Sequence, residues 1–396
     1  MKSQKIFTRT IWTLCLVSLF NDISSEMLYP VMPFYLKSIG FTALWIGILE
    51  GVAELVVGLS KGYFGKLSDE RGKRLPFVQF GYFLSAIAKS MLALFAQPLW
   101  VLFSRSGDKL GKGIRTSARD AMLSDECSKE NKGKVFGLHR ALDTAGAAMG
   151  PLIALAYLYY HPGDYKPLFL IAFAPAMMSV LLTLFIHERK KEASTPLSLT
   201  AKGNFFSYLS YWKKSSGEYR SLVIGLLLFA LFNSSDVFLL LMAKNVGISD
   251  QNIILVYVFF NLIYALASLP LGHLADKIGM GKAFMLGLVC FCIAYTGMAF
   301  LKNTTTLLVV FSIYGIYMAC TEGISKAWIA KIAPQNETAT AIGFHASVSS
   351  MVTMAASTMA GLLWVSSGAS TTFLISAAGA FVTLIYFLLN KKIRTR

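Results

Sequence analysis

Long apolar runs constrain this 396-residue chain more than any other feature, because a helix needs about 20 such residues to cross a bilayer. We predict a transmembrane helix in each of twelve runs: 11–36, 42–61, 75–96, 98–118, 135–159, 167–187, 221–243, 252–272, 282–301, 305–326, 338–364 and 370–390. Strands are not expected, because open strands leave backbone groups unpaired in lipid and the runs lack the alternation of a barrel. The sequence therefore predicts an all-α membrane protein.

Composition supports this class and excludes others. Hydrophobic residues make up 55% of the chain and charged residues only 15%, which is too apolar for a soluble protein of this size. The net charge of +16 does not indicate nucleic-acid binding, because Lys and Arg lie between the apolar runs and no nucleic-acid motif is present. An odd number of cysteines argues against a disulfide framework, and we expect no metal and no cofactor; the five are Cys15, Cys127, Cys290, Cys292 and Cys320.

Basic residues gather in every second loop. Seven of them lie between Arg189 and Arg220, after the sixth run, whereas the loops on the other side hold isolated lysines. Such a bias places the basic loops in the cytoplasm, so both termini are predicted to be cytoplasmic. We predict a multi-pass monomer in the bacterial inner membrane. The isolated lysines are Lys37, Lys166, Lys244 and Lys302.

Four short matches, in the same order, relate the two halves of the chain. Their members are roughly 206 to 212 residues apart, and such duplication is typical of alternating-access transporters. We predict two pseudo-symmetric six-helix bundles, at 1–187 and 221–396, joined by a cytoplasmic linker at 188–220. The matches pair 19–21 with 231–233, 37–40 with 244–247, 65–69 with 272–276, and 137–139 with 343–345.

The linker has two interpretations. It is either a simple tether or an amphipathic segment lying along the membrane surface. The second depends on its aromatic residues, which are Phe205, Phe206, Tyr208, Tyr211 and Trp212.

Residues 65–74, between the second and third runs, read GKLSDERGKR. Gly72 suits the positive φ of a tight turn, and Asp69 can lie at a helix N-terminus or meet an arginine. The segment, with Gly65, Lys73 and Arg74, resembles the cytoplasmic-loop signature of the major facilitator superfamily. The resemblance covers the whole chain and implies that Asp69 belongs to a cytoplasmic gate. A degenerate copy keeps Gly272, Asp276 and Gly279 but has Met280 in place of a basic residue.

The fifth run carries a second pattern, which resembles the motif of proton-coupled antiporters in this superfamily. It consists of Gly137, Gly146, Gly150 and Pro151, with Ala154 and Leu155 where the motif ends in glycines. The alternative interpretation is ordinary packing of small residues between helices.

Two acids lie four residues apart in the first run. Asp22 and Glu26 share one helical face, next to Asn21, at membrane depth where unused charge is costly. In the superfamily, the first, fourth, seventh and tenth helices line the central cavity, so the resemblance places both acids near Arg105 and Asp108. A carboxyl group that alternates between dry and wet surroundings can bind and release a proton. The alternative is that Glu26 lies in the headgroups and Asp22 only pairs with Arg105.

Charge also crowds the fourth run, from Val101 to Asp120. Arg105, Asp108 and three further basic residues recur at helical spacing, so they predict one charged helix face that cannot meet lipid. The alternative is that the helix ends early and Lys109 to Asp120 form a loop.

Residues 107–113 are too short for a phosphate-binding loop, and no enzyme motif is present. Further candidates for the cavity are Asp143, Asn233, Asp236 and Glu322.

These observations predict a transporter, not an enzyme. We expect a proton-coupled carrier of a small, charged organic solute, with efflux by antiport favoured by the fifth-run glycines. The first alternative is a proton symporter that imports an organic nutrient or an iron–siderophore complex. The second is a membrane sensor or channel, which lacks support because there is no soluble signalling domain.

Overall fold

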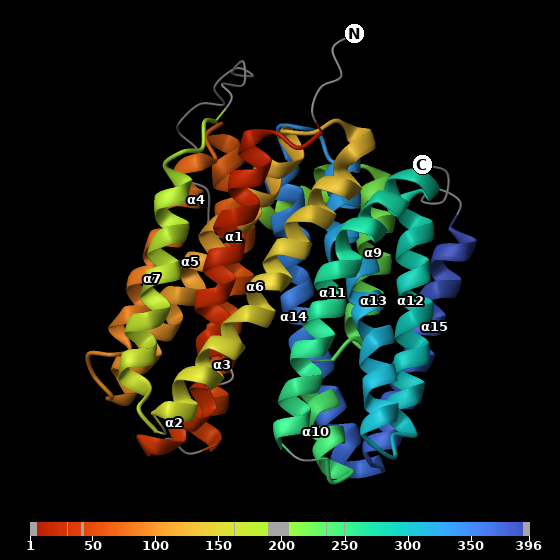
Figure 1. Cartoon of the computed structure of the whole chain (residues 1–396). Coiled ribbons are helices and arrows are strands. Elements are labelled where there is room, and N and C mark those ends of the chain that lie inside the picture. The colour runs from red at the N-terminus through yellow and green to blue at the C-terminus, as the bar shows by residue number, and fades with distance from the viewer. Residues whose placement is uncertain are drawn as a thin grey trace. The chain divides into compact units, whose positions relative to one another are not determined.

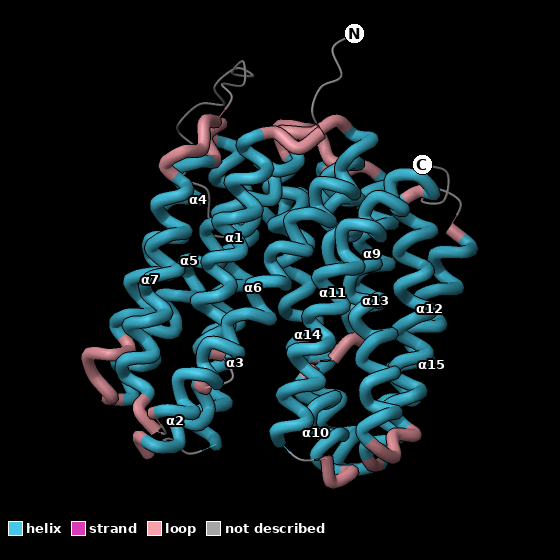
Figure 2. The backbone as a smooth tube through the Cα atoms, in the orientation of Figure 1, coloured by secondary structure: helices cyan, strands magenta, loops and turns pink. Residues whose placement is uncertain are grey.

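The structure is a computed structural model that describes residues 6–29, 31–40, 43–161, 163–188, 206–234, 236–248 and 250–390. Within these ranges every regular element is helical (Figures 1 and 2). The chain is a multi-pass helical protein, as predicted. Its helices are α1 (Arg9–Leu28), α2 (Met32–Ser38), α3 (Ala43–Glu70), α4 (Leu75–Met91), α5 (Pro98–Asp125), α6 (Lys132–Tyr160), α7 (Tyr165–Thr183), α8 (Tyr211–Lys214), α9 (Gly217–Phe232), α10 (Val237–Asn245), α11 (Asp250–Ile278), α12 (Met280–Ala299), α13 (Thr304–Ile332), α14 (Thr338–Ser367) and α15 (Ala369–Leu389), with the short 3₁₀ turns η1 (Lys129–Asn131) and η2 (Ser207–Ser210).

Two predicted runs are broken helices. The prediction of one continuous helix over 11–36 was wrong, because α1 ends at Leu28 and α2 begins at Met32. Pro30 and Pro33 explain this break, since proline cannot continue the hydrogen-bond ladder. The prediction over 221–243 was wrong in the same way, since α9 ends at Phe232 and α10 begins at Val237. Here the sequence between them is Asn-Ser-Ser-Asp, and these residue types favour turns and helix ends over helix interiors.

Length and apolar composition mark seven of the described helices as able to cross a membrane. An eighth qualifies if Ser207–Lys214 and Gly217–Phe232, bent by 118° at their break, form one span. The 28 residues of α5 do not qualify on this basis because of their charged stripe. Its length and its burial against neighbouring helices nevertheless suit a span whose polar face is shielded from lipid.

The described helices form two compact units. Unit 1 comprises residues 1–128, 142–214 and 333–347, and unit 2 comprises residues 129–141, 215–332 and 348–396. Two helices are therefore shared: α6 belongs to unit 2 up to Ala141, and α14 belongs to unit 1 up to Ser347. Unit 2 is rich in stacked aromatic rings, such as Phe291 and Tyr295, whose centroids are 3.9 Å apart.

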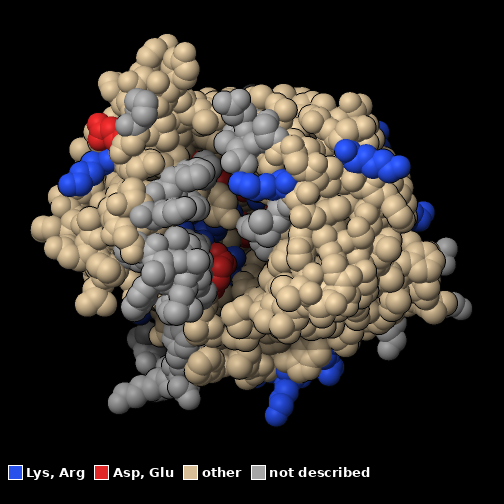
Figure 3. Space-filling model, turned by 90° about the horizontal axis from the view of Figure 1, so that it is seen from below, with Lys and Arg blue, Asp and Glu red and all other residues tan. Residues whose placement is uncertain are grey.

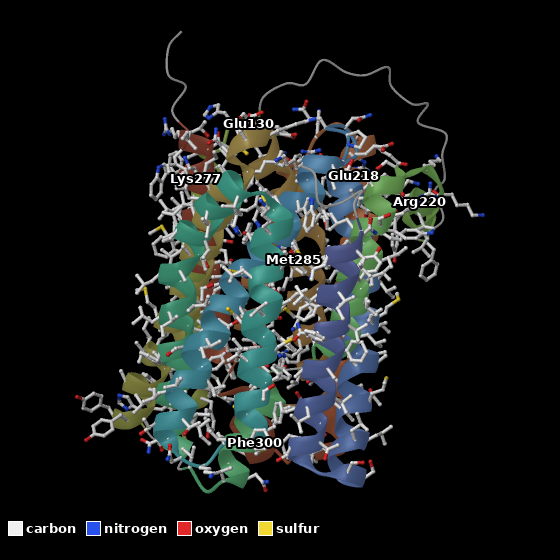
Figure 4. The ribbon with its side chains drawn as sticks, turned by 90° about the vertical axis from the view of Figure 1, so that its right-hand side faces the viewer. Glu130, Glu218, Arg220, Lys277, Met285 and Phe300 are labelled. Atoms are coloured by element: carbon white, nitrogen blue, oxygen red, sulfur yellow. The ribbon has the colours of Figure 1, made fainter. Side chains whose placement is uncertain are left out.

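Several charged side chains gather at one end of unit 2. In Figure 4, Glu130, Glu218, Arg220 and Lys277 lie at one end, and Phe300 lies at the other. Figure 3 views the molecule from below and shows isolated charged side chains on a surface that is otherwise mostly uncharged. A membrane protein needs this distribution, because charge is tolerated where the helices leave the hydrocarbon.

The last part of the linker is folded against unit 1. We call residues Ser207–Lys214, which form η2 and α8, the strap. The Tyr208 side chain is fully buried; its ring lies against Gly62 of α3, and its hydroxyl group is 2.7 Å from Ser347 Oγ of α14. The Trp212 ring stacks on Phe344 with centroids 5.8 Å apart. The strap is therefore packed on helices, neither a loose tether nor a helix lying only on the membrane surface; Phe205 falls outside the described residues.

Candidate functional site

Two glycines fix α5 inside unit 1. A Cβ atom on Gly111 would lie 2.5 Å from the Gly81 carbonyl oxygen of α4, and one on Gly113 would overlap Ser60 of α3. The backbones therefore approach closely on both sides of α5, which only glycine allows. The alternative of a loop from Lys109 to Asp120 is wrong, because α5 is helical to Asp125.

The N-terminal part of the charged stripe on α5, at Arg105 and Asp108, lies near a lysine of α4. Asp108 Oδ1 lies 3.9 Å from Nζ of Lys89, a buried residue. The Lys89 ammonium group also donates to Ser25 Oγ of α1, at 2.6 Å. Arg105 is buried one turn from Asp108, and its charge acts on that carboxylate. Lys89 was not among the predicted site residues, although a lone lysine in an apolar run is a signal that could have revealed it.

The C-terminal part of the stripe, at Arg115 and Arg119, forms a second buried cluster. Arg115 donates to Ser85 Oγ at 2.6 Å, and its guanidinium carbon lies 4.4 Å from the centroid of the Tyr82 ring. Arg119 donates to Asp120 at 2.9 Å and to the Tyr82 hydroxyl group at 3.3 Å. Paired and hydrogen-bonded charges of this kind can be buried, so this cluster holds α4 and α5 together.

Asp22 meets a carboxyl group from another helix. Its side chain accepts a hydrogen bond from Asn21 at 3.0 Å and contacts the carboxyl group of Asp143, on α6. Glycines make this contact possible: a Cβ atom on Gly146 would lie 2.5 Å from the Leu19 carbonyl oxygen. The antiporter-like glycines thus place the α6 backbone directly on α1.

The four residues of the fifth-run pattern have separate neighbours. Gly150 continues the contact with α1, where its Cβ atom would lie 2.6 Å from the Ile23 carbonyl oxygen. Gly137 instead packs in unit 2, where its Cβ atom would lie 2.6 Å from the Ser268 carbonyl oxygen of α11. Pro151 lies inside α6. The spacing of the pattern therefore serves two different helix contacts.

The acids of unit 2 have their own partners. Asp236 lies at the start of α10, next to the helix break that follows Asn233, and accepts a hydrogen bond from the Tyr314 hydroxyl group at 2.7 Å. Glu322 pairs with Arg140 of α6 at 2.5 Å. Tyr314 was not predicted, since a tyrosine among many aromatic residues carries no distinguishing sequence signal.

Asp69 caps a helix and meets an arginine at the same time. One carboxylate oxygen accepts from Arg74 at 2.7 Å, and the other accepts from the Thr340 backbone N–H at 2.7 Å and its hydroxyl group at 2.9 Å. Thr340 lies in the first turn of α14, where unpaired N–H groups and the helix dipole favour an anion. Arg74 also pairs with Asp125.

Asp276 makes the corresponding contact in unit 2. Its two oxygens accept from the backbone N–H groups of Gly133 and Lys134, each at 2.8 Å, in the first turn of α6. Close backbone approaches accompany both caps: Gly65 lies against Ala339, and Gly272 lies against Gly133. The position that corresponds to Arg74 is Gly281, so this second cap has no arginine.

The remaining residues of the two loop motifs shape turns. Gly72 has φ +62° and Gly279 has φ +97°, conformations that side-chain-bearing residues rarely adopt. Lys73 is exposed, as a headgroup-facing basic residue should be. Met280, which replaces the basic residue of the copy, is fully buried.

Comparison with known proteins agrees with this architecture. The family model of the Major Facilitator Superfamily matches residues 14–242 and 221–395. An uncharacterised MFS-type transporter of Methanocaldococcus jannaschii is 30% identical over 369 residues, which cover 92% of this chain and 90% of that protein. A homologue of the multidrug-resistance efflux pump PmrA from Lactococcus lactis is 24% identical over 330 residues, covering 80% of this chain and 78% of that protein.

A solved structure shows the same fold. The human organic anion transporter MFSD10 superimposes with a TM-score of 0.82 at 16% sequence identity, covering 97% of this chain and 100% of that chain. The predicted fold class and the resemblance to the major facilitator superfamily are thus confirmed, and the chain is a transporter and not an enzyme. It belongs to the Major Facilitator Superfamily.

Proposed function

We propose that the protein is a proton-coupled secondary transporter that moves a small, charged organic solute by alternating access, with efflux by proton antiport. One observation carries the proposal: the carboxyl groups of Asp22 and Asp143 meet inside unit 1, between two transmembrane helices. Two carboxylates in contact repel each other strongly, so such a pair is most stable when it shares one proton. The pair is the proton carrier in this proposal.

The glycine contact between α1 and α6 links this proton site to conformational change. Asp22 and Asp143 can share a proton only while the two backbones stay as close as Gly146 and Gly150 allow. A rearrangement of α1 against α6 separates the carboxyl groups and favours release of the proton. Binding of a proton and movement of the helices thereby become linked equilibria.

The two helix caps supply the gate. Asp69 and Asp276 each bind the first turn of a helix that is shared between the units, α14 and α6 respectively. In this proposal the caps form in one conformation of the transport cycle and break in the other. Gly65 at one cap and Gly272 at the other permit the close approach, and the charged interactions make it reversible.

Efflux is supported by two findings. Gly146 and Gly150 belong to the antiporter-like pattern, and one relative is named as a homologue of a multidrug-resistance efflux pump. Location in the bacterial inner membrane, with both termini in the cytoplasm, is supported by the loops rich in Lys and Arg. We propose that the transporter functions as a monomer.

A reconstituted system tests the function directly. Purified protein in liposomes is given an imposed pH gradient of either sign, and a panel of labelled charged solutes is followed. Antiport predicts accumulation of a solute on the acidic side of the membrane, with loss of accumulation when an ionophore collapses the gradient. Accumulation on the alkaline side would establish the symport alternative, and movement that ignores the gradient would remove proton coupling.

A further inference from the structure

We infer that Lys112 and Glu26 form a two-pole binding site for a zwitterionic solute, one that carries a carboxylate and an ammonium group. The inference rests on the proposed antiport and names its substrate class. It begins from the direction in which Lys112 points. The flanking Gly111 packs on α4 and Gly113 packs on α3. Because Lys112 lies between them on the helix, its side chain points to the side of α5 that faces neither helix.

Lys112 is exposed at this position, although the residues on both sides of it are buried. Lipid is not what it faces, because its charge acts on Asp22 and Glu26 of α1 and on Glu54 of α3. The lysine therefore faces a solvent-accessible space bordered by acids. Such a space inside a membrane protein is where a polar solute can bind.

Three other basic side chains of this region already have acidic partners. Lys109 pairs with Glu54 at 2.6 Å, Lys89 faces Asp108 at 3.9 Å, and Arg119 pairs with Asp120. By contrast, none of the described side chains forms an ion pair or a hydrogen bond with the Lys112 ammonium group. The same is true of the Glu26 carboxyl group within the described ranges.

Lys112 and Glu26 nevertheless belong together. The strongest charge that acts on Glu26 is that of Lys112, yet the two groups are too far apart for a direct ion pair. One cation and one acid thus face a shared space without meeting. A solute with two opposite charges interacts favourably with both groups at once. A solute that carries only a negative charge is repelled by the acids, and one that carries only a positive charge is repelled by Lys112.

The antiport mechanism also favours a solute that carries an ammonium group. A proton and a substrate can drive each other across only if they compete, and an ammonium group competes with protons for the Asp22 and Glu26 carboxyl groups. The carboxylate of the solute then neutralises Lys112, which would otherwise repel the ammonium group. The site therefore selects zwitterions over solutes that carry only one of the two charges, because a missing charge leaves one of its own groups unpaired.

Matched solutes test this inference. Full-length purified protein is heated with three probes built on each of leucine, phenylalanine and histidine: the free amino acid, its methyl ester and its N-acetyl derivative. The zwitterion of at least one set is expected to raise the unfolding temperature, while the ester, which lacks the carboxylate, and the acetyl derivative, which lacks the ammonium group, do not.

Variants assign the two poles. Lys112→Gln and Glu26→Gln are each expected to weaken binding of the zwitterion about 10- to 100-fold, as loss of one charge-assisted contact does. Lys166→Gln, an exposed lysine of α7 in the same unit, is the control and should bind normally. Two results overturn the inference: no zwitterion stabilises the protein in preference to its derivatives, or Lys112→Gln binds it as tightly as the wild type.

The outcome is separable from the proposed function. Zwitterion binding that depends on Lys112, without transport driven by a pH gradient, would remove proton coupling and leave the two-pole site. Gradient-driven transport of a solute whose binding ignores both Lys112 and Glu26 would do the reverse.

Discussion

At the scale of single residues, Asp22 and Asp143 are expected to act together as one proton site. Asp22→Asn fixes the site in a neutral state that resembles the protonated one. We expect it to abolish accumulation driven by a pH gradient while exchange of solute across the membrane at equal pH continues. Asp143→Asn should do the same, and the double variant should be no worse than either, because the two residues act as one unit. Additive losses, measured in the same liposomes, would show that they act separately.

The two cap aspartates should not be equivalent. Asp69 has an arginine partner and Asp276 has none, so Asp69→Asn loses a charge-assisted hydrogen bond worth about 1.5–3 kcal/mol in addition to the helix-dipole interaction. Asp276→Asn loses part of the dipole interaction, about 0.3–1 kcal/mol, and one of its two backbone hydrogen bonds, because an amide nitrogen cannot accept; it has no arginine contact to lose. Both variants should insert and fold, and Asp69→Asn should slow transport more. Initial rates in liposomes, normalised to the amount of protein, compare them; equal slowing would contradict the asymmetry.

At the scale of elements, the contact between α1 and α6 is expected to tolerate no side chain. Gly150→Ala places a Cβ atom 2.6 Å from two backbone atoms of α1, so a shift of the helices is unavoidable. Overpacking of this kind costs about 1–3 kcal/mol, and it also separates Asp22 from Asp143. We expect a lower unfolding temperature together with weaker coupling to the pH gradient.

Gly217→Ala is the matched control for that change. A Cβ atom on Gly217, at the start of α9, meets nothing within 4 Å. The variant should keep both stability and coupling. Loss of coupling in both variants would indicate a general effect of glycine replacement.

The strap is expected to hold α14 against α3. Tyr208→Ala removes a fully buried ring, which typically costs about 3–5 kcal/mol, whereas Tyr208→Phe removes only the hydrogen bond to Ser347, about 1 kcal/mol. Trypsin should therefore cleave at Lys213 and Lys214 much faster in Tyr208→Ala than in Tyr208→Phe, because cleavage requires local unfolding. Equal cleavage rates would mean that the ring does not anchor the strap.

Sequence patterns specified the elements far better than their breaks or contacts. Apolar length located the spans, because the bilayer imposes it on every helix. The break between α9 and α10 was not predicted, because Asn233 and Asp236 were assigned to a cavity although both residue types also favour helix ends. The partners of Lys89 and Tyr208 could not be predicted for a different reason. A lone lysine in an apolar run marks Lys89 and the aromatic linker marks Tyr208, but their partners, Ser25 and Ser347, lie far away in the chain and no local pattern encodes them.

At the scale of the whole molecule, the basic loops predict the orientation. Cysteines introduced at Lys302 and Lys166 should react with a membrane-impermeant reagent in intact cells, whereas one at Lys213 should react only after lysis. Both groups of positions are exposed, so accessibility alone does not separate them. Labelling of the Lys213 position in intact cells would reverse the topology.

The reciprocal caps have an evolutionary consequence. Asp69, from the first repeat, binds the start of a helix in the second repeat, and Asp276, from the second, binds the corresponding helix of the first. When residue i of one part meets residue j of the other and j meets i, the contact is isologous, the arrangement that a twofold homodimer generates. An ancestor half this long, paired with a second copy of itself, would have closed both contacts with one aspartate. Duplication would then free the copies to diverge, and in the present chain only the first has an arginine beside its acid.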